Sequence, residues 1–211
     1  MSKLSLLGAV LATICSVISM PSSAALINNG GGLIYDDVLK ITWAQPDTFR
    51  SWGDANAWAA GLTLGGVSGW RLPYISVAEG AGPFTGDPVD CNTATELACR
   101  DNELGYMFYH NLGGTYKESI LDSGDPDLAL FPTLKSQGYW SGTEFDSSFA
   151  WKLIFHSGEL SLDGTGEVNY GVHNWAVHAG NIHPIPIPAA VWLFGSGLLG
   201  LVGMERRKKA E

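Results

Sequence analysis

Alternation of apolar and polar residues predicts strands near both ends of the central region. Leu39, Ile41 and Trp43 alternate with polar or smaller residues across 38–43, which is the period-two pattern of a strand with one packed face. Near the other end, "YGVHNWAVHAG" (170–180) places Trp175 and Val177 on one side of a last strand.

A hairpin is the clearest pattern in the chain. In "SFAWKLIFHSGELSL" the alternate apolar residues from Phe149 to Phe155, Trp151 included, share one face of a strand. Gly158 then supplies a turn, and Leu160 and Leu162 begin the partner strand. We therefore predict an antiparallel pair here.

Two helices are predicted between these strands. Residues 51–54, "SWGD", have the spacing of a capping box, and apolar residues follow at helical intervals: Trp52, Ala55, Ala59 and Leu62. A second apolar stripe after Asn102 ends at Gly113: Leu104, Met107, Phe108 and Leu112. The stretches 78–90 and 121–133, rich in Gly, Pro and Asp, read as surface loops. We expect one loop-rich α+β domain with an antiparallel sheet, two helices and no alternating β-α rhythm.

The first 25 residues have the features of a secretory signal peptide. Lys3 precedes an apolar stretch from Leu4 to Ile18, and Ser22-x-Ala24 and Ser23-x-Ala25 satisfy the small-x-small cleavage rule. The mature chain is expected to begin at Ala25 or Leu26. The alternative is an uncleaved anchor, for which the apolar stretch is short.

Charge excludes one class of partner. Residues 26–183 form the predicted domain and hold 19 of the 21 acidic residues and 7 of the 12 basic ones, a net charge of −12. A surface of this sign repels phosphate backbones, so we expect no nucleic-acid binding.

Cysteine usage agrees with export. After removal of the signal peptide only Cys91 and Cys99 remain, an even pair in an oxidising compartment. We predict a disulfide that closes "CNTATELAC". A metal site would need more soft ligands nearby, and a catalytic thiol would need a base and a lowered pKa.

Few residues suggest catalysis or metal binding. There is no G-x-S-x-G, no H-E-x-x-H and no phosphate-cradling Gly loop, so we expect no enzyme and no cofactor. Histidines at 173, 178 and 183 recur every five residues. On a strand this spacing places neighbouring histidines on opposite faces, so we do not expect the three to form a metal site.

Calcium is a minor alternative in "LDSGDPD", where Asp122, Asp125 and Asp127 offer hard oxygen ligands but without the EF-hand spacing. A solvated acidic turn is the simpler interpretation.

Tryptophan is in excess, with eight in the chain and seven outside the C-terminal tail. Aromatic rings can stack on sugar rings, which suggests carbohydrate binding. Most of these tryptophans occupy periodic positions, however, and are expected to be core residues.

Three short sequences are distinctive in their order: "GGVSGWRLP" (65–73), "GYWSGTE" (138–144) and "WAVHAG" (175–180). Together with the strand at 35–44 and the helix at 51–62, they resemble the Lcl C-terminal domain family, named for the end domain of a collagen-like bacterial adhesin. The resemblance spans about 31–180. It implies an extracellular adhesive or ligand-binding module, with a fold related to the C-type-lectin-like group and no catalytic residues.

The sequence departs from that family's pattern at two positions. Gly69 stands where an Asp often precedes "WRLP", and His178 stands where an Arg often follows "WAV". The structural motif itself comprises Trp70, Arg71, Leu72, Pro73, Tyr139, Trp140 and Ser141. Within it Arg71 is expected to hold loop carbonyls or a carboxylate through its planar fork, and Pro73 to fix the direction in which the chain leaves.

The C-terminal segment, 184–211, combines a Pro-Ile ladder, sixteen uncharged residues (189–204) and a basic end. The apolar stretch predicts a transmembrane helix just short of the usual span, with the basic cluster on the cytoplasmic side: Arg206, Arg207, Lys208 and Lys209. The whole segment is similar to bacterial exosortase sorting signals (PEP-CTERM) of the VPLPA kind. The matching residues are Pro186, Ile187, Pro188 and Ala189.

By that resemblance, signal peptidase is expected to remove the N-terminal segment on export, and the C-terminal helix to hold the protein in the membrane. An exosortase-like membrane protease is then expected to cut near 186–189 and release the protein to the cell surface or extracellular matrix of a Gram-negative bacterium. The alternative for the C-terminal segment is a permanent membrane anchor. We expect a binding domain for polysaccharide. The alternatives are an extracellular enzyme of unknown reaction and a purely structural matrix protein.

Overall fold

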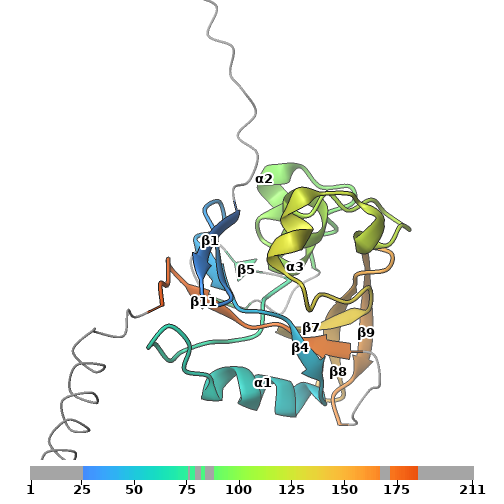
Figure 1. Cartoon of the computed structure of the whole chain (residues 1–211). Helices are drawn as coiled ribbons and strands as arrows, with labels where there is room; N and C mark the ends of the chain where they lie inside the picture. The colour runs from blue at the N-terminus through green and yellow to red at the C-terminus, as the bar shows by residue number, and fades with distance from the viewer. Residues whose placement is uncertain (1–25, 76, 79–81, 84–87, 167–171, 185–211) are drawn as a thin grey trace, which may run out of the picture.

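The computed structural model describes residues 26–75, 77–78, 82–83, 88–166 and 172–184 (Figure 1). Two main sheets and a few short helices form this part of the chain, which confirms the α+β class. Within the described residues no helix is long and apolar enough to span a bilayer. The predicted signal peptide, the sorting motif and the predicted transmembrane helix all lie outside those residues.

The first sheet is antiparallel and has the order β1-β2-β3-β11. Its strands are β1 (Leu26–Gly30), β2 (Leu33–Asp36), β3 (Ile41–Trp43) and β11 (Val177–Ala179). The segments nearest the two ends of the described chain, β1 and β11, therefore form its two edges.

The second sheet has the order β4-β10-β7-β8-β9. Its strands are β4 (Asp47–Phe49), β7 (Gly138–Glu144), β8 (Phe149–Ile154), β9 (Glu159–Gly164) and β10 (Val172–Asn174). The predicted hairpin is β8 and β9, with Trp151 opposite Leu162. The pairings in the two main sheets are antiparallel as predicted, with the exception of β10 and β7, which pair in parallel. A small pair, β5 (Val77–Ala78) and β6 (Gly82–Pro83), stands apart.

The predicted helices are present with changed limits. α1 (Trp52–Gly61) begins as expected, because Ser51 accepts a hydrogen bond from the backbone N–H of Asp54. The second predicted helix is α3 (Glu103–Tyr106), which continues as a π-helical turn, η1 (Met107–Asn111). α2 (Glu96–Cys99) precedes it. The stretch 121–133, predicted as a loop, contains 3-10 turns instead: η2 (Ile120–Asp122) overlaps its start and η3 (Pro126–Leu130) lies within it.

The central strand β7 is buried on both faces over most of its length. α1 lies on one side of it, and α2, α3 and the following turns lie on the other (Figure 1). Adjacent residues of β7 accordingly enter different core clusters, Tyr139 with Phe108 and Trp140 with Ala55 and Ala59. Strands covered on both sides lose the simple alternation of buried and exposed residues.

Two strand predictions are confirmed only in part: β3 covers 41–43 of the predicted 38–43, and the predicted last strand is present in two pieces. Thr42 is as buried as its apolar neighbours, and 37–40 form a turn in which Lys40 has φ 58°. The buried Asp36 carboxylate accepts the backbone N–H groups of Val38 and Leu39 and so fixes that turn. The predicted last strand divides at Trp175 into β10 and β11, which belong to different sheets.

The predicted disulfide is present. Cys91 and Cys99 are joined, with their Cα atoms 5.0 Å apart, and both are buried beside Tyr106. Gly105 allows α3 to approach this bridge, because a Cβ there would lie 2.6 Å from Cys91 Sγ. The bridge closes the loop that leads from residue 88 into α2.

Candidate functional site

Exposure separates the tryptophans into two groups. Four are fully buried core residues with at most 2% of their surface exposed: Trp43, Trp70, Trp140 and Trp175. Trp52, Trp58 and Trp151 are half-buried. The Trp52 indole N–H is engaged, since it donates to the carbonyl of Ser141. Within the described residues the indole N–H groups of Trp58 and Trp151 have no hydrogen-bond partner, so these two can serve a ligand.

Trp151 lines an open pocket of about 500 Å³ beside the β8-β9 turn. Tyr116 supplies a second aromatic ring and is 39% exposed. Polar side chains complete the lining: Asp90, Glu159 and Ser161. We call these five residues the Trp151 site. Two aromatic surfaces with a few convergent polar groups are the usual composition of a small-molecule pocket.

Glu159 is held firmly at this site. Tyr116 donates its hydroxyl to Glu159 Oε1 at 3.2 Å, and Ser157 donates to Oε2 at 3.0 Å. The hydrogen bond to Glu159 raises the pKa of the Tyr116 hydroxyl. Two donors leave lone pairs of the carboxylate free, so Glu159 can still accept hydrogen bonds from a ligand.

Asp90 reaches the same pocket from the loop that ends at Cys91. Its carboxylate accepts the backbone N–H of Asn92 at 3.0 Å, which turns the chain into the disulfide loop. The disulfide fixes Cys91, the residue next to Asp90. The position of the Asp90 carboxylate in the pocket therefore depends on the disulfide.

Gly158 forms the turn beneath the pocket. Its φ is +72°, and a Cβ there would lie 2.5 Å from the Tyr109 hydroxyl and 2.7 Å from Phe108. The Tyr109 hydroxyl donates to the carbonyl of Gly158 at 2.9 Å. Backbone conformation and space both require glycine at this position.

Arg71 and Glu103 hold the "WRLP" motif against α3. The guanidinium makes two hydrogen bonds of 2.7 Å, one to each carboxylate oxygen, and lies 4.1 Å from the ring centre of Tyr74. Glu103 Oε2 also accepts the backbone N–H of Tyr74 at 2.7 Å. The carboxylate expected for Arg71 is thus Glu103, and its oxygens are used within the domain.

The rest of the structural motif is in the core. Trp70 and Leu72 pack in the same cluster against α1, and Pro73 is buried with its carbonyl bonded to the N–H of Gly142. Tyr139 accepts the N–H of Lys135, and Ser141 donates to the carbonyl of Trp151. Trp140 donates to the carbonyl of Arg50. None of these groups lines the Trp151 site.

The two departures from the Lcl pattern are neighbours in space. A Cβ on Gly69 would lie 3.7 Å from His178 Nε2. The His178 ring packs on Trp70, with centroids 5.4 Å apart, and Nε2 lies 3.0 Å from the carbonyl of Ser68. The contact with the carbonyl of Ser68 thus holds His178 beside Gly69.

The candidate calcium ligands do not converge on one point. Asp125 caps η3 by accepting the N–H of Asp127, and Asp122 ends η2. Across the described ranges no three His, Cys, Asp or Glu side chains are grouped to hold a metal ion.

His173 lies between the carbonyl of Asp47 and the amide of Gln137, while His183 is exposed at the end of the described chain.

Comparison of the chain with protein-family models, curated proteins and solved structures found no match. The site must therefore be interpreted from its own geometry.

Sequence reasoning missed the Trp151 site. Strand alternation assigned Trp151 to a packed face, and its ring does pack against the core cluster that contains Leu153 and Phe155. The ring is only half-buried, however, and its remaining surface lines the pocket. Tyr116, Asp90 and Glu159 come from three separate segments, and no short motif links them. The position of Glu159 directly after the hairpin turn was the one available signal.

Proposed function

We propose that this protein is an exported, exosortase-sorted envelope or matrix protein whose domain binds polysaccharide at the Trp151 site. The observation that carries the proposal is the combination of Trp151 and Tyr116 rings with Asp90 and Glu159 carboxylates in one open pocket of about 500 Å³. Aromatic rings pack against the C–H faces of sugars, and carboxylates accept their hydroxyl protons.

The charge of the site narrows the polysaccharide. Asp90 and Glu159 lie in a domain of net charge −12, and like charges across an interface are unfavourable. The expected ligands are neutral sugars or amino sugars, whereas uronic-acid and sulfated polymers are expected to be rejected. An open pocket can hold a few sugar units of a long polysaccharide while the rest of the polymer extends into solvent. Such binding fits a role in adhesion.

The test is a glycan array followed by calorimetric titration of the best neutral oligosaccharide. Trp151→Ala should weaken binding about 30-fold, the usual effect of truncating an aromatic anchor. Trp58→Ala is the matched control, because Trp58 is also a half-buried surface tryptophan, and it should bind as the wild type does.

Other outcomes separate the alternatives. No bound glycan with a folded protein would favour the purely structural role. Release of shorter oligosaccharides, abolished by Glu159→Gln or Asp90→Asn, would favour an extracellular enzyme. Equal losses from Trp151→Ala and Trp58→Ala would contradict the assignment of the site.

A further inference from the structure

Exposed aromatic rings gather around Trp151. Among the described residues, four phenylalanine, tyrosine or tryptophan side chains are at least 39% exposed: Phe49, Tyr116, Phe145 and Phe149. Phe49 is on β4, at the edge of the second sheet opposite to β9. Tyr116 lines the Trp151 site. The other two, Phe145 and Phe149, flank the turn between β7 and β8.

Both of these phenylalanines adjoin Trp151. The Phe145 ring packs against the Trp151 ring, with centroids 5.7 Å apart and an angle of 90° between the planes. Phe149 lies two residues before Trp151 on β8, so their side chains are on the same face of the strand, about 7 Å apart along it. Phe149 pairs with Gly164 on β9, which has no side chain that could cover the ring. We call Phe145, Phe149 and Trp151 the aromatic strip.

The turn that carries the two phenylalanines is firmly held. Asp146 Oδ1 accepts the backbone N–H groups of Ser148 at 2.8 Å and Phe149 at 2.9 Å. The carbonyl of Phe149 accepts the N–H groups of Phe145 at 2.9 Å and Asp146 at 3.1 Å. The rings are thus exposed on an ordered turn, and a ligand can bind them without the entropy cost of ordering the chain.

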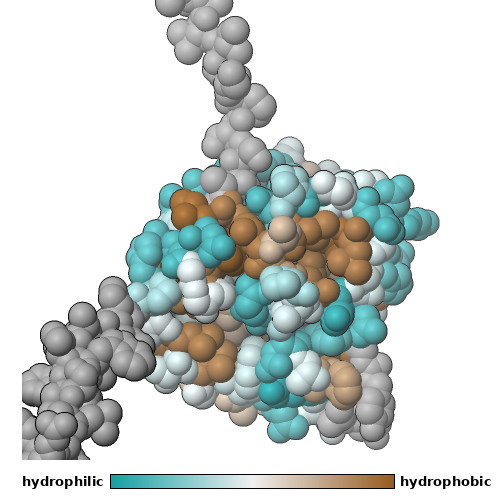
Figure 2. All heavy atoms as spheres, viewed as in Figure 1, coloured by the Kyte–Doolittle hydropathy of each residue, from teal (hydrophilic) through white to brown (hydrophobic). Residues whose placement is uncertain are grey.

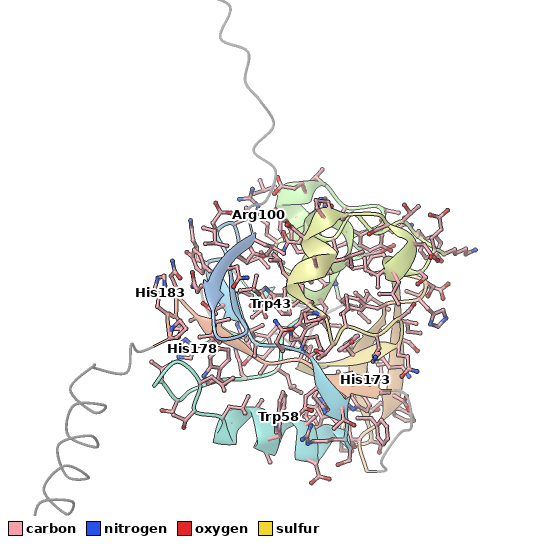
Figure 3. All side chains as sticks on the ribbon, in the orientation of Figure 1. Trp43, Trp58, Arg100, His173, His178 and His183 are labelled. Carbon is pink, nitrogen blue, oxygen red and sulfur yellow. A yellow bond between two sulfur atoms is a disulfide. The ribbon has the colours of Figure 1, made fainter. Side chains whose placement is uncertain are left out.

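Exposed apolar surface by itself does not identify a binding site. Single apolar side chains are common on protein surfaces, and Figure 2 shows a band of hydrophobic residues over β1 and α3 as well. Trp58 is also half-buried, but it lies on α1 (Figure 3) and packs against the other core cluster. The aromatic strip differs from both, because its Trp151 ring also lines a pocket that contains carboxylates. The strip therefore extends the Trp151 site along the sheet.

The pocket and the strip together form one long surface on β8. The pocket reaches Ile154 at one end of this strand, and Phe149 is at the other end. Five residue steps along a strand span about 17 Å, which is longer than one sugar unit. Side chains on one face of a strand follow a nearly straight line. Such a surface suits a ligand that is itself straight and presents apolar faces repeatedly.

We propose that the aromatic strip is a second subsite for the polysaccharide that binds at the Trp151 site, and that this polysaccharide is an extended, neutral, β-linked chain of the cellulose or chitin type. In such chains the linkages are equatorial, so successive sugars present flat C–H faces that pack on aromatic rings. Chains of the amylose type coil and leave a straight strip after a few units. The inference rests on the proposed sugar binding at the Trp151 site and adds to it a chain length and a linkage.

Titration calorimetry with oligosaccharides of two lengths tests the proposal. The full-length protein in mild detergent should bind the hexasaccharides of the cellulose or chitin series about 10-fold more tightly than the disaccharides, because only the longer chains reach Phe149. The double variant Phe145→Ala/Phe149→Ala should lose about 10-fold in affinity for the hexasaccharide, as expected when aromatic contacts are truncated. Its affinity for the disaccharide should stay that of the wild type.

Two further variants serve as controls. Phe49→Ala also removes an exposed ring of the same sheet, but at the opposite edge, and it should bind both lengths as the wild type does. Phe149→Tyr keeps an aromatic ring and should keep the preference for the longer chain. Circular dichroism and thermal unfolding should show that the double variant folds, because the two phenylalanines are 53% and 44% exposed.

The outcomes separate this inference from the proposed function. Equal affinity of the wild type for both lengths, or equal losses for both lengths in the double variant, would overturn the second subsite and leave sugar binding at the Trp151 site intact. Tighter binding of malto-oligosaccharides than of the β-linked series would overturn the linkage. A dimer that the double variant converts to a monomer, with sugar affinity unchanged, would assign the strip to self-association instead. Failure of every oligosaccharide to bind would refute the proposed function itself.

Discussion

Arg71 and Glu103 form a bidentate ion pair with both hydrogen bonds at 2.7 Å. The Glu103 side chain is 6% exposed and that of Arg71 is 28% exposed. The pair joins the loop before Tyr74 to the start of α3, and its bonds are made within the domain. Its role is therefore to hold two segments together.

The first prediction concerns this pair. Arg71→Ala should lower the free energy of unfolding by about 3 kcal/mol, because it leaves the Glu103 carboxylate buried and unpaired. Arg71→Lys keeps the charge but loses the second hydrogen bond, and it should cost about half as much. Urea denaturation measures both. Sugar affinity of the folded fraction should not change, and a loss of affinity at normal stability would contradict this role.

Gly158 provides a second prediction. Gly158→Ala should cost about 2–4 kcal/mol, because a positive φ is strained for alanine and the new methyl would press on Tyr109 and Phe108. Gly124 is the matched control. Its φ is +70° but a Cβ there has open space, so Gly124→Ala should show only the backbone strain, about 1 kcal/mol. Equal costs for the two variants would refute the steric part of this explanation.

The disulfide links stability to the Trp151 site. Replacing Cys91 and Cys99 together by serine should lower the free energy of unfolding by about 2–3 kcal/mol on the loop-entropy estimate. Without the disulfide the loop would no longer hold Asp90, which precedes Cys91 and lines the pocket, in its position. Sugar affinity of the folded double variant should fall, as measured by titration at low temperature. Unchanged affinity would mean that Asp90 does not contribute.

The sequence predicted the elements that form through interactions between residues close together in the chain. The cap at Ser51 is set by its own side chain, and the β8-β9 hairpin is set by alternation and a glycine turn, so both were predictable. The disulfide was predicted from the expected export of the chain and from the presence of only two cysteines in 26–183. These elements form from interactions within a few residues of one another.

Long-range arrangement was not predictable in the same way. Thr42 looked like an exposed strand position, but its hydroxyl donates to the carbonyl of Gly180 at 2.6 Å, a residue far along the chain. Nor does the sequence indicate that Asp90, Tyr116 and Glu159 meet beside Trp151. That site depends on how the disulfide loop is placed against the second sheet.

His110 gives a pH-dependent prediction. Burial lowers its pKa, and its ring packs on Tyr106 with centroids 4.9 Å apart. Glu96 and Arg100 are the nearby charges and act in opposite directions. Above about pH 6.5 both folded and unfolded states carry a neutral imidazole. Below it the unfolded state takes up a proton that the folded state resists, so stability falls as the pH drops.

His110→Phe keeps an aromatic ring against Tyr106 and removes the titration. Between pH 6.5 and 5 its free energy of unfolding should fall less steeply than that of the wild type, by up to about 1.4 kcal/mol per pH unit. Asp36 acts in the opposite sense: burial raises its pKa in the fold, so acid favours the folded state as Asp36 takes up a proton. The wild type and His110→Phe both keep Asp36, so the difference between their slopes isolates the contribution of His110. Parallel slopes would contradict the lowered pKa of the half-buried His110.

The last prediction concerns the C-terminus of the protein purified from the organism that makes it. If the resemblance to sorting signals is functional, mass spectrometry should find a chain that ends near 186–189 and lacks the basic residues 206–209. Every contact described for the end of the domain involves residues up to Pro184, so such a cut leaves them in place. Replacing Pro186 and Pro188 by alanine should prevent the cut and leave a chain that ends at Glu211. A wild-type protein that itself ends at Glu211 would show that the C-terminal segment is a permanent anchor.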